Sequence, residues 1–248
     1  MAEKQSPNKR PSKNAKKGLN PKTKTIAAKA GKRGGPAKSA SKLTARRAIE
    51  SQPAEQDRSD EKTFLIVGVG ASAGGLEAFT KLLEHLPPDT GMAFVLVQHL
   101  APTKDSMLAK LLSKATSMPV REVQDGMIAE SDHVYVIPPN TALTIFHGKL
   151  RLLPRGEAHT QHMPVDSFFR SLAEDQGQDA VGVILSGTGS DGSLGIRAIK
   201  AEGGIVMAQE EQSAKYDGMP KSAAQTGAVD FILPPEKIAS ELVRISRH

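Results

Sequence analysis

The segment from residue 64 to residue 86 limits what this chain can fold into more than any other stretch. It opens with an unbroken apolar run, typical of a strand that is buried on both faces of a parallel sheet. Four glycines follow, at Gly68, Gly70, Gly74 and Gly75, and we expect them to allow a tight turn from strand to helix. A helix packed back onto the sheet is predicted by the spacing of Leu76, Phe79, Leu83 and Leu86.

Ser72 lies in the middle of this turn, which could belong to one of several kinds of functional loop. A dinucleotide site would place an acidic residue at the end of the next strand, yet that strand ends in Gln98 and His99. A phosphate loop of the nucleotide-hydrolase kind would close on Gly-Lys-Ser or Gly-Lys-Thr, which this turn does not. The sequence from Gly70 to Gly74 matches the G-x-S-x-G nucleophile elbow, and a plain connecting turn remains the alternative.

The charge of the chain is divided unevenly along its length. Residues 1–60 hold 16 Lys and Arg against 5 Asp and Glu, a net charge of +11, whereas the remaining residues hold 17 against 22, a net charge of −5. No aromatic residue precedes Phe64, so the first segment cannot bury enough apolar surface to offset its ordering entropy. We therefore predict a disordered basic tail over 1–60 and one domain over 61–248.

The sequence contains no cysteine, which excludes thiol catalysis, disulfides and cysteine-based zinc sites. It has no apolar secretion signal and no run of about 18 apolar residues that could span a membrane. These features predict a cytoplasmic protein. The basic tail predicts attraction to an anionic partner, such as DNA or an anionic membrane surface, although a tethering extension without a partner is equally compatible with its composition.

Strand and helix patterns alternate through the rest of the chain. This alternation predicts an α/β fold with a doubly wound, mostly parallel sheet, and a small antiparallel hairpin over 142–154 as an annex to it. Beyond the first segment, the predicted strands are 93–98, 120–123, 133–138, 180–186, 203–209 and 229–233. Four further helices are predicted. One has its inner face at Leu108, Leu111, Leu112 and Ala115, a second starts at Pro164 and Asp166, and the last two span 193–201 and 235–246.

Three chemically active side chains follow the carboxyl ends of three predicted buried strands: Ser72, His99 and Asp191. In parallel sheets, ligands bind beyond these ends. A serine hydroxyl needs an imidazole to take its proton, and the imidazole needs a carboxylate to hold its tautomer and stabilise its charge. Each residue also has a structural alternative: a helix N-cap, a strand-end hydrogen-bonding group and a turn residue, respectively. Their coincidence predicts a catalytic triad.

The segments around these residues resemble a known family. The stretches GVGASAGGLEA, LVQHL and ILSGTGSDGSLGIRAIKAEGG look like signature segments of the chemotaxis protein-glutamate methylesterase family, the CheB catalytic domain. DGM (125–127), YVIPPN (135–140) and YDGMPKSA (216–223) are similar to it too, and the resemblance covers about residues 62–245. It implies a serine hydrolase that removes methyl esters from receptor glutamates and deamidates glutamines, with its triad at Ser72, His99 and Asp191.

The sequence also departs from the pattern of that family. Threonine is common there at the position of Ala73 and methionine at the position of Thr188, and we expect these two positions, with Met219, to shape the substrate cleft. Residues 216–220 are predicted to form a loop over the sheet edge. Chemotaxis members usually carry a receiver domain before the catalytic domain, and here a basic tail stands in its place. The resemblance therefore implies no phosphorylation control in cis.

No cofactor or metal is expected. His159 and His162 are three residues apart, but their predicted loop offers no carboxylate at ligand spacing. The expected partner is a methylated chemoreceptor or related signalling protein as substrate, and we expect a monomer. The alternative function is that of a non-catalytic signalling adaptor with a nucleic-acid-binding tail.

Overall fold

Strand β1 (Ile66–Ala71) lies inside a seven-stranded sheet in the computed structural model, which describes residues 64–98, 107–154 and 163–247. Every pair of neighbouring strands in this sheet is parallel. The prediction of a mostly parallel sheet is therefore confirmed. The strand order is β10 (Phe231–Leu233), β9 (Ile205–Gln209), β8 (Ala180–Ile184), β1, β2 (Ala93–Gln98), β5 (His133–Val136) and β3 (Val120–Glu122).

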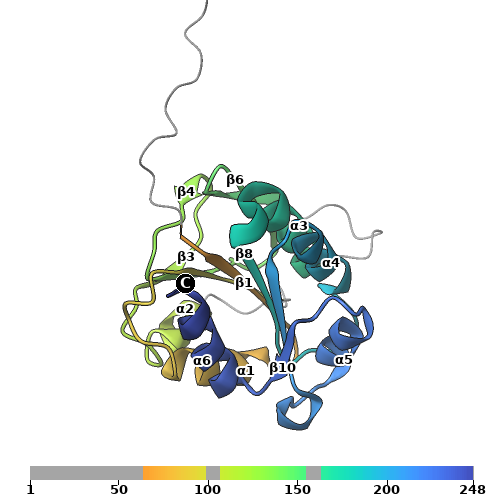
Figure 1. Cartoon of the computed structure of the whole chain (residues 1–248). Helices are drawn as coiled ribbons and strands as arrows, with labels where there is room; N and C mark the ends of the chain where they lie inside the picture. Colours follow the sequence, from red (N-terminus) through yellow and green to blue (C-terminus); the bar gives the residue numbers. More distant parts are fainter. Residues whose placement is uncertain (1–63, 99–106, 155–162, 248) are drawn as a thin grey trace, which may run out of the picture. The chain divides into compact units, whose positions relative to one another are not determined.

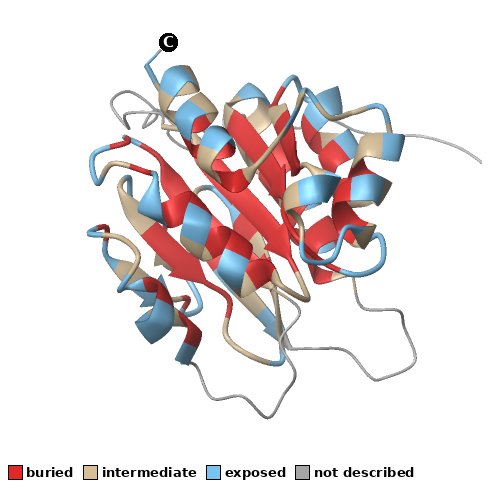
Figure 2. Ribbon diagram, turned by 90° about the horizontal axis from the view of Figure 1, so that it is seen from below, coloured by how far each residue is buried: buried red, intermediate tan, exposed pale blue. Residues whose placement is uncertain are grey.

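Helices cover both faces of the sheet, as expected for a doubly wound fold (Figure 1). One face packs against α1 (Gly75–Glu84), α2 (Met107–Leu112) and α6 (Pro235–Ile245), and the other against α3 (Pro164–Gln176), α4 (Ser193–Ala201) and α5 (Gly218–Gln225). Val67 and Val69 of β1 belong to the first core and Ile66 belongs to the second, because side chains alternate between the faces of a strand. Figure 2 shows that the central strands are buried along their length.

The prediction that all four glycines of the first segment serve the turn is wrong for two of them. Gly68 and Gly70 lie within β1, not in the turn that follows it. A Cβ atom at Gly68 would lie 2.9 Å from Phe169 and 3.0 Å from Leu172, both on α3. Only a residue without a side chain lets α3 approach the strand this closely. The turn itself depends on Gly74, whose φ of 74° lies in the left-handed region.

The antiparallel hairpin is present, but it belongs to a separate three-stranded sheet and not to the main one. Its order is β4 (Met127–Ile128), β7 (Lys149–Pro154) and β6 (Thr141–Phe146), all antiparallel. The turn between β6 and β7 consists of His147 and Gly148, both with positive φ, as a type I′ hairpin requires. Asp175 of α3 accepts hydrogen bonds from the backbone N–H groups of both turn residues, which fixes the small sheet on that helix.

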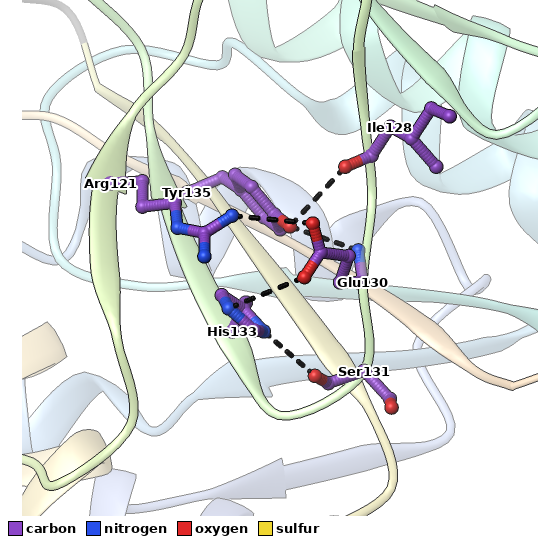
Figure 3. Close-up of polar contacts among 6 residues, drawn as sticks. All are labelled: Arg121, Ile128, Glu130, Ser131, His133 and Tyr135. Atoms are coloured by element: carbon purple, nitrogen blue, oxygen red, sulfur yellow. Dashed lines mark hydrogen bonds and ion pairs between the residues drawn. The ribbon is translucent and has the colours of Figure 1, made fainter.

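A polar network beside β5 links the two sheets (Figure 3). The Tyr135 hydroxyl accepts a hydrogen bond of 2.9 Å from the Glu130 N–H and donates one of 3.4 Å to the Ile128 carbonyl, at the end of β4. The Glu130 carboxylate lies 3.3 Å from the Arg121 guanidinium and 3.6 Å from Nε2 of His133. Burial of Tyr135 raises the pKa of its hydroxyl. The buried tyrosine thus fixes the chain that leads from β4 to β5.

Two predictions about local structure are wrong. Residues 218–220 begin helix α5 and are not part of a loop, because Gly218 and Pro220 occupy the first turn of the helix, where a proline costs no hydrogen bond. Leu111 was expected on the inner face of its helix, yet 42% of its surface is exposed, since α2 buries only Leu108 and Leu112.

Several helices begin and end close to their predicted bounds, among them α4 and α6. The described residues all belong to one structural unit of the chain, which spans residues 57–248. Within the described ranges, no helix has the length and apolar character needed to cross a membrane. The predicted tail over 1–60 lies outside the described residues.

Candidate active site

Three neighbouring strands end together at one edge of the main sheet. β1 lies between β8 and β2, with Gly70 opposite Ile184 of β8 and Ala71 opposite Gln98 of β2. Ser72 directly follows β1, and the loop after β8 leads to Asp191. The topology therefore brings the Ser72 turn and the Asp191 loop to the same edge, where ligands bind in doubly wound sheets.

Ser72 is not the cap of the helix that follows it. Helix α1 begins at Gly75, its N-cap residue is Gly74, and no side chain caps it. The backbone N–H of Ser72 donates a 3.1 Å hydrogen bond to the Ser186 carbonyl, and its carbonyl accepts one of 3.0 Å from the Gly75 N–H. The Ser72 hydroxyl makes no hydrogen bond to a described residue, and the residue is half-buried. The structural alternative for this serine therefore loses its support.

Asp191 performs a structural task that the sequence did not indicate. Its two carboxylate oxygens accept hydrogen bonds of 3.1 Å from the Val165 N–H and 3.0 Å from the Asp166 N–H, so this residue caps helix α3 from the neighbouring loop. Burial removes water from the carboxylate and raises the pKa of Asp191 from 3.8 to about 6, although these N–H groups oppose the rise. Each oxygen keeps a lone pair for a further donor.

Asp166 caps a second helix. Its side chain is 4% exposed, and its Oδ1 atom accepts hydrogen bonds of 2.9 Å from Leu194 N–H and 2.7 Å from Gly195 N–H. Asp166 was predicted as a helix-start residue; it lies in the first turn of α3 but caps α4 instead. Asp191, which precedes α4, thus caps α3, and Asp166, which lies in α3, caps α4. Together the two carboxylates fix the loop that carries Asp191.

Val165 packs between the end of β1, just before Ser72, and the Asp191 loop. A Cβ atom at Gly70, two residues before Ser72, would lie 2.3 Å from Cγ1 of Val165, and one at Gly192 would lie 2.8 Å from the same atom. The valine side chain therefore fills the space against both backbones. A shift of α3 would move both loops, so their relative position depends on the packing of this helix.

The three predicted cleft residues differ in their surroundings. Met219 is 1% exposed, and its sulfur would lie 2.2 Å from a Cβ atom placed on Gly187, while Cβ of Ser72 would lie 3.1 Å from that atom. Met219 and Ser72 thus lie against the same glycine. Thr188, the next residue along, is exposed, and Ala73 is half-buried beside the serine. Met219 also belongs to the apolar core between the sheet and helices α3, α4 and α5.

The predicted base His99 lies outside the described residues, as do His159 and His162. β2 ends at Gln98, one residue before His99. Among the described residues no group of three His, Cys, Asp or Glu side chains is placed to hold a metal ion. The structure therefore places Ser72 and Asp191 at one edge and leaves the position of His99 as a prediction from the sequence.

Sequence reasoning missed two side chains that hold the Ser72 turn. Nε2 of Gln98 donates a 3.1 Å hydrogen bond to the Ser72 carbonyl, and Oγ of Ser186 donates one of 2.9 Å to the Ala73 carbonyl. Ser186 is 1% exposed. The sequence did contain a signal for both: Gln98 and Ser186 each end an otherwise apolar predicted strand. A polar residue in such a place is costly to bury without a hydrogen-bond partner.

Similarity to known proteins identifies the family. Residues 67–242 match the family described as CheB methylesterase. The chain belongs to this family. The resemblance predicted from the sequence segments is therefore confirmed, and the CheB methylesterase match includes both Ser72 and Asp191.

Individual relatives agree with this assignment. The chain is 38% identical over 179 residues to the protein-glutamate methylesterase/protein-glutamine glutaminase 3 of Burkholderia orbicola, which covers 72% of this chain and 53% of that protein. It is 45% identical over 131 residues to an uncharacterized 104.1 kDa protein of Rhodobacter capsulatus, covering 53% of this chain and 14% of the relative. The chain spans about half the length of the curated methylesterases it matches.

A solved structure supports the fold. The crystal structure of the Thermotoga maritima CheB methylesterase catalytic domain aligns with a TM-score of 0.68 and 30% sequence identity. The alignment covers 74% of this chain and 99% of that domain. The described body of this chain thus has the architecture of a CheB catalytic domain.

Proposed function

We propose that this chain hydrolyses methyl esters on glutamate side chains of chemoreceptors or related signalling proteins, and that it also deamidates glutamines. The observation that carries the proposal is the arrangement at the carboxyl edge of the sheet. There, Ser72 has a hydroxyl free of helix capping, and the loop that carries Asp191 packs against the same valine as the end of β1 that leads into Ser72. The names of its relatives, protein-glutamate methylesterase/protein-glutamine glutaminase, indicate the same reaction.

In the proposed reaction, His99 takes the proton of the Ser72 hydroxyl while the oxygen attacks the ester carbonyl carbon. The tetrahedral intermediate collapses, the carbon–oxygen bond to the methoxy group breaks, and the proton from His99 leaves with methanol. Water then attacks the acyl-enzyme by the same route and releases the glutamate carboxylate and Ser72. With a glutamine substrate, ammonia leaves in place of methanol.

Asp191 is the proposed partner of His99. Its carboxylate supports the imidazolium that forms in each step, and it must be ionised to do so. The two backbone N–H groups of α3 fix the orientation of this carboxylate. Its raised pKa, about 6, leaves it ionised at neutral pH.

The backbone N–H of Ala73 is the proposed donor to the oxyanion. In a nucleophile elbow, the N–H that follows the serine faces the developing negative charge. No described residue accepts a hydrogen bond from the Ala73 N–H. Ala73, Thr188 and Met219 are proposed to line the cleft through which the glutamyl side chain enters.

Methanol release from a methylated receptor preparation tests the proposal. The wild-type chain is compared with the variants Ser72→Ala and His99→Ala and with the double variant. Each single variant should lose several orders of magnitude of activity, and the double variant should be little worse, because the two residues act as a unit. Methanol release by Ser72→Ala at the wild-type rate would refute the proposal. The adaptor alternative would require a wild-type chain that releases no methanol.

The basic segment 1–60 is proposed to bind an anionic partner, because its net charge is +11. Removing it should abolish binding to duplex DNA or anionic vesicles and leave turnover of a small ester unchanged. Binding that survives truncation would contradict this. The proposed cytoplasmic location and monomeric state can be checked by cell fractionation and by light scattering.

A further inference from the structure

The Ser72 turn has a defined geometry that depends on contacts with neighbouring strands. The Gly75 N–H bonds to the Ser72 carbonyl, which closes a four-residue β-turn, and Gly74 occupies its third position with φ 74° and ψ −2°. Ala73 is not among the residues with positive φ. These values are those of a type II turn, which differs from a type I turn by reversal of the central peptide, here between Ala73 and Gly74.

Gln98 holds the first peptide of this turn. Its Nε2 atom donates a 3.1 Å hydrogen bond to the Ser72 carbonyl from the end of β2. In a planar trans peptide the carbonyl and the N–H of the next residue point in opposite directions. The Ala73 N–H is therefore directed away from Gln98. Reversal of this peptide would remove that N–H from its proposed place in the oxyanion hole.

Ser186 holds the central peptide. Its hydroxyl donates a 2.9 Å hydrogen bond to the Ala73 carbonyl and accepts one of 3.0 Å from the Tyr216 N–H, while its own carbonyl accepts the Ser72 N–H at 3.1 Å. Oε1 of Gln209 in turn accepts the Ser186 N–H at 2.9 Å. Each hydrogen-bonding group of Ser186 thus has a partner, and the hydroxyl favours the type II orientation over its reverse.

Burial supports a role beyond packing for Ser186 and for its partner Gln209. The structure describes four buried polar or charged residues, and three of them act on the loops of the candidate site, since Ser186 and Gln209 hold the Ser72 turn while Asp166 fixes the Asp191 loop. Burying a polar side chain costs free energy that an alanine would not. The polar groups of the core are therefore concentrated where the backbone orientation matters for chemistry.

We propose that Gln98 and Ser186 are positioning residues that lock the two peptides after Ser72, so that the Ala73 N–H is aimed at the oxyanion before substrate binds. This inference rests on the proposed esterase function. Neither side chain needs to touch the substrate. Their effect is transmitted through the Ser72 and Ala73 carbonyls, so it should appear in the transition state more than in substrate binding.

The test uses the full chain and a soluble peptide that carries a glutamate methyl ester. The variants are Gln98→Met and Gln98→Glu, which both lack the neutral amide donor, and Ser186→Ala, with Ser186→Thr as the conservative variant that keeps the hydroxyl. Ser240→Ala is the matched control, because the Ser240 hydroxyl also donates to a carbonyl, at 3.1 Å, but on the exposed face of helix α6. The readouts are kcat, KM, the melting temperature and the rate of Ser72 labelling by a fluorophosphonate.

Removing either donor should lower kcat and the labelling rate by about 10- to 100-fold with little change in KM, because a misdirected oxyanion donor weakens only the transition state. Ser186→Thr should recover most of this loss, and Ser240→Ala should match the wild type. The effects of Gln98→Met and Ser186→Ala should not add, because both act on one turn.

A folded Gln98→Met or Ser186→Ala variant with wild-type kcat would overturn the inference, and so would a Ser186→Thr variant as poor as Ser186→Ala. If Ser186→Ala does not fold, the two Gln98 variants and Ser186→Thr decide the matter alone. Wild-type activity in Ser72→Ala, measured in the same assay, would instead refute the proposed function. The two failures are therefore distinguishable.

Discussion

Two carboxylates at opposite ends of the parallel strands have very different surroundings. Glu130 lies beside His133, the first residue of β5, and is 53% exposed, and its carboxylate contacts the Arg121 guanidinium and the His133 imidazole. Asp191 lies beyond the carboxyl ends of the strands, is half-buried, and is held by backbone N–H groups alone among the described residues. Burial raises the pKa of Asp191 to about 6.

The difference separates a structural cluster from the proposed catalytic one. The network in Figure 3 collects more charged side chains than the Asp191 loop does, and most of its charge is compensated and in contact with water. Exposed ion pairs of this kind contribute little free energy. At Asp191, burial removes water from the carboxylate, and no cationic side chain among the described residues pairs with it. A group left in that state can stabilise a charge that appears during a reaction.

The largest expected effect is on activity. Asp191→Asn should lower ester turnover by about three orders of magnitude, because an amide cannot stabilise the imidazolium of the proposed base. Glu130→Gln, the matched change at the other end of the strands, should leave turnover within about twofold of the wild type. Steady-state methanol release by both variants measures the comparison. Equal losses in the two variants would remove the distinction between the clusters.

The second effect is the pH dependence of stability. The folded protein binds a proton at Asp191 more tightly than the unfolded chain does, because the pKa is raised to about 6. This contribution to stability is present below about pH 4 and is lost as the pH rises through about 6. Relative to Asp191→Asn, the wild type should therefore be more stable at about pH 4 than at about pH 7.5. Calorimetry at both pH values, with Glu130→Gln as control, measures the difference in unfolding free energy between wild type and Asp191→Asn. The same difference at both pH values would contradict the prediction.

The third effect concerns the cap of α4. Asp166→Ala removes the acceptor of two backbone N–H groups, Leu194 and Gly195, and should lower the free energy of unfolding by about 1–3 kcal/mol. Asp166→Asn should lose less, because both bonds use a single oxygen atom that asparagine retains. Urea denaturation measures both variants. If Asn and Ala were equally destabilising, the cap would depend on charge and not on the hydrogen bonds.

The smallest effect is at the structural cluster itself. Arg121→Ala removes an exposed partner of Glu130 and should change the free energy of unfolding by less than about 1 kcal/mol. Urea denaturation is again the measurement. A larger loss would mean that the network beside β5 holds the two sheets together more strongly than its exposed ion pairs imply.

The sequence was sufficient to predict the fold and the sheet edge at which Ser72 and the Asp191 loop lie. Buried strands such as β1 and β8 have continuous apolar runs, so their parallel pairing and the edge carrying Ser72 and Asp191 followed from periodicity. The two-residue strand β4 is too short to leave a pattern, and α5 was missed because Gly218 and Pro220 are usually turn residues.

Other parts of the site depend on contacts between distant segments. Ser186 meets Ala73 across 113 positions, and Asp166 meets Gly195 across 29. No periodicity in one segment encodes such a bond. The role of the β1 glycines is likewise hidden from sequence spacing, because they admit α3, whose residues lie about 100 positions later. Sequence spacing predicts elements, and packing decides which polar groups meet between them.

Covalent trapping at Ser72 tests the central claim most directly. The protein is incubated with a fluorophosphonate and digested with trypsin, and the peptide 63–81, whose only serine is Ser72, is examined by mass spectrometry. We predict a stoichiometric adduct on Ser72 that forms far more slowly in Asp191→Asn and His99→Ala but at the wild-type rate in Glu130→Gln. An unmodified Ser72 in a protein that releases methanol, or an adduct on a different serine that abolishes this release, would contradict the account.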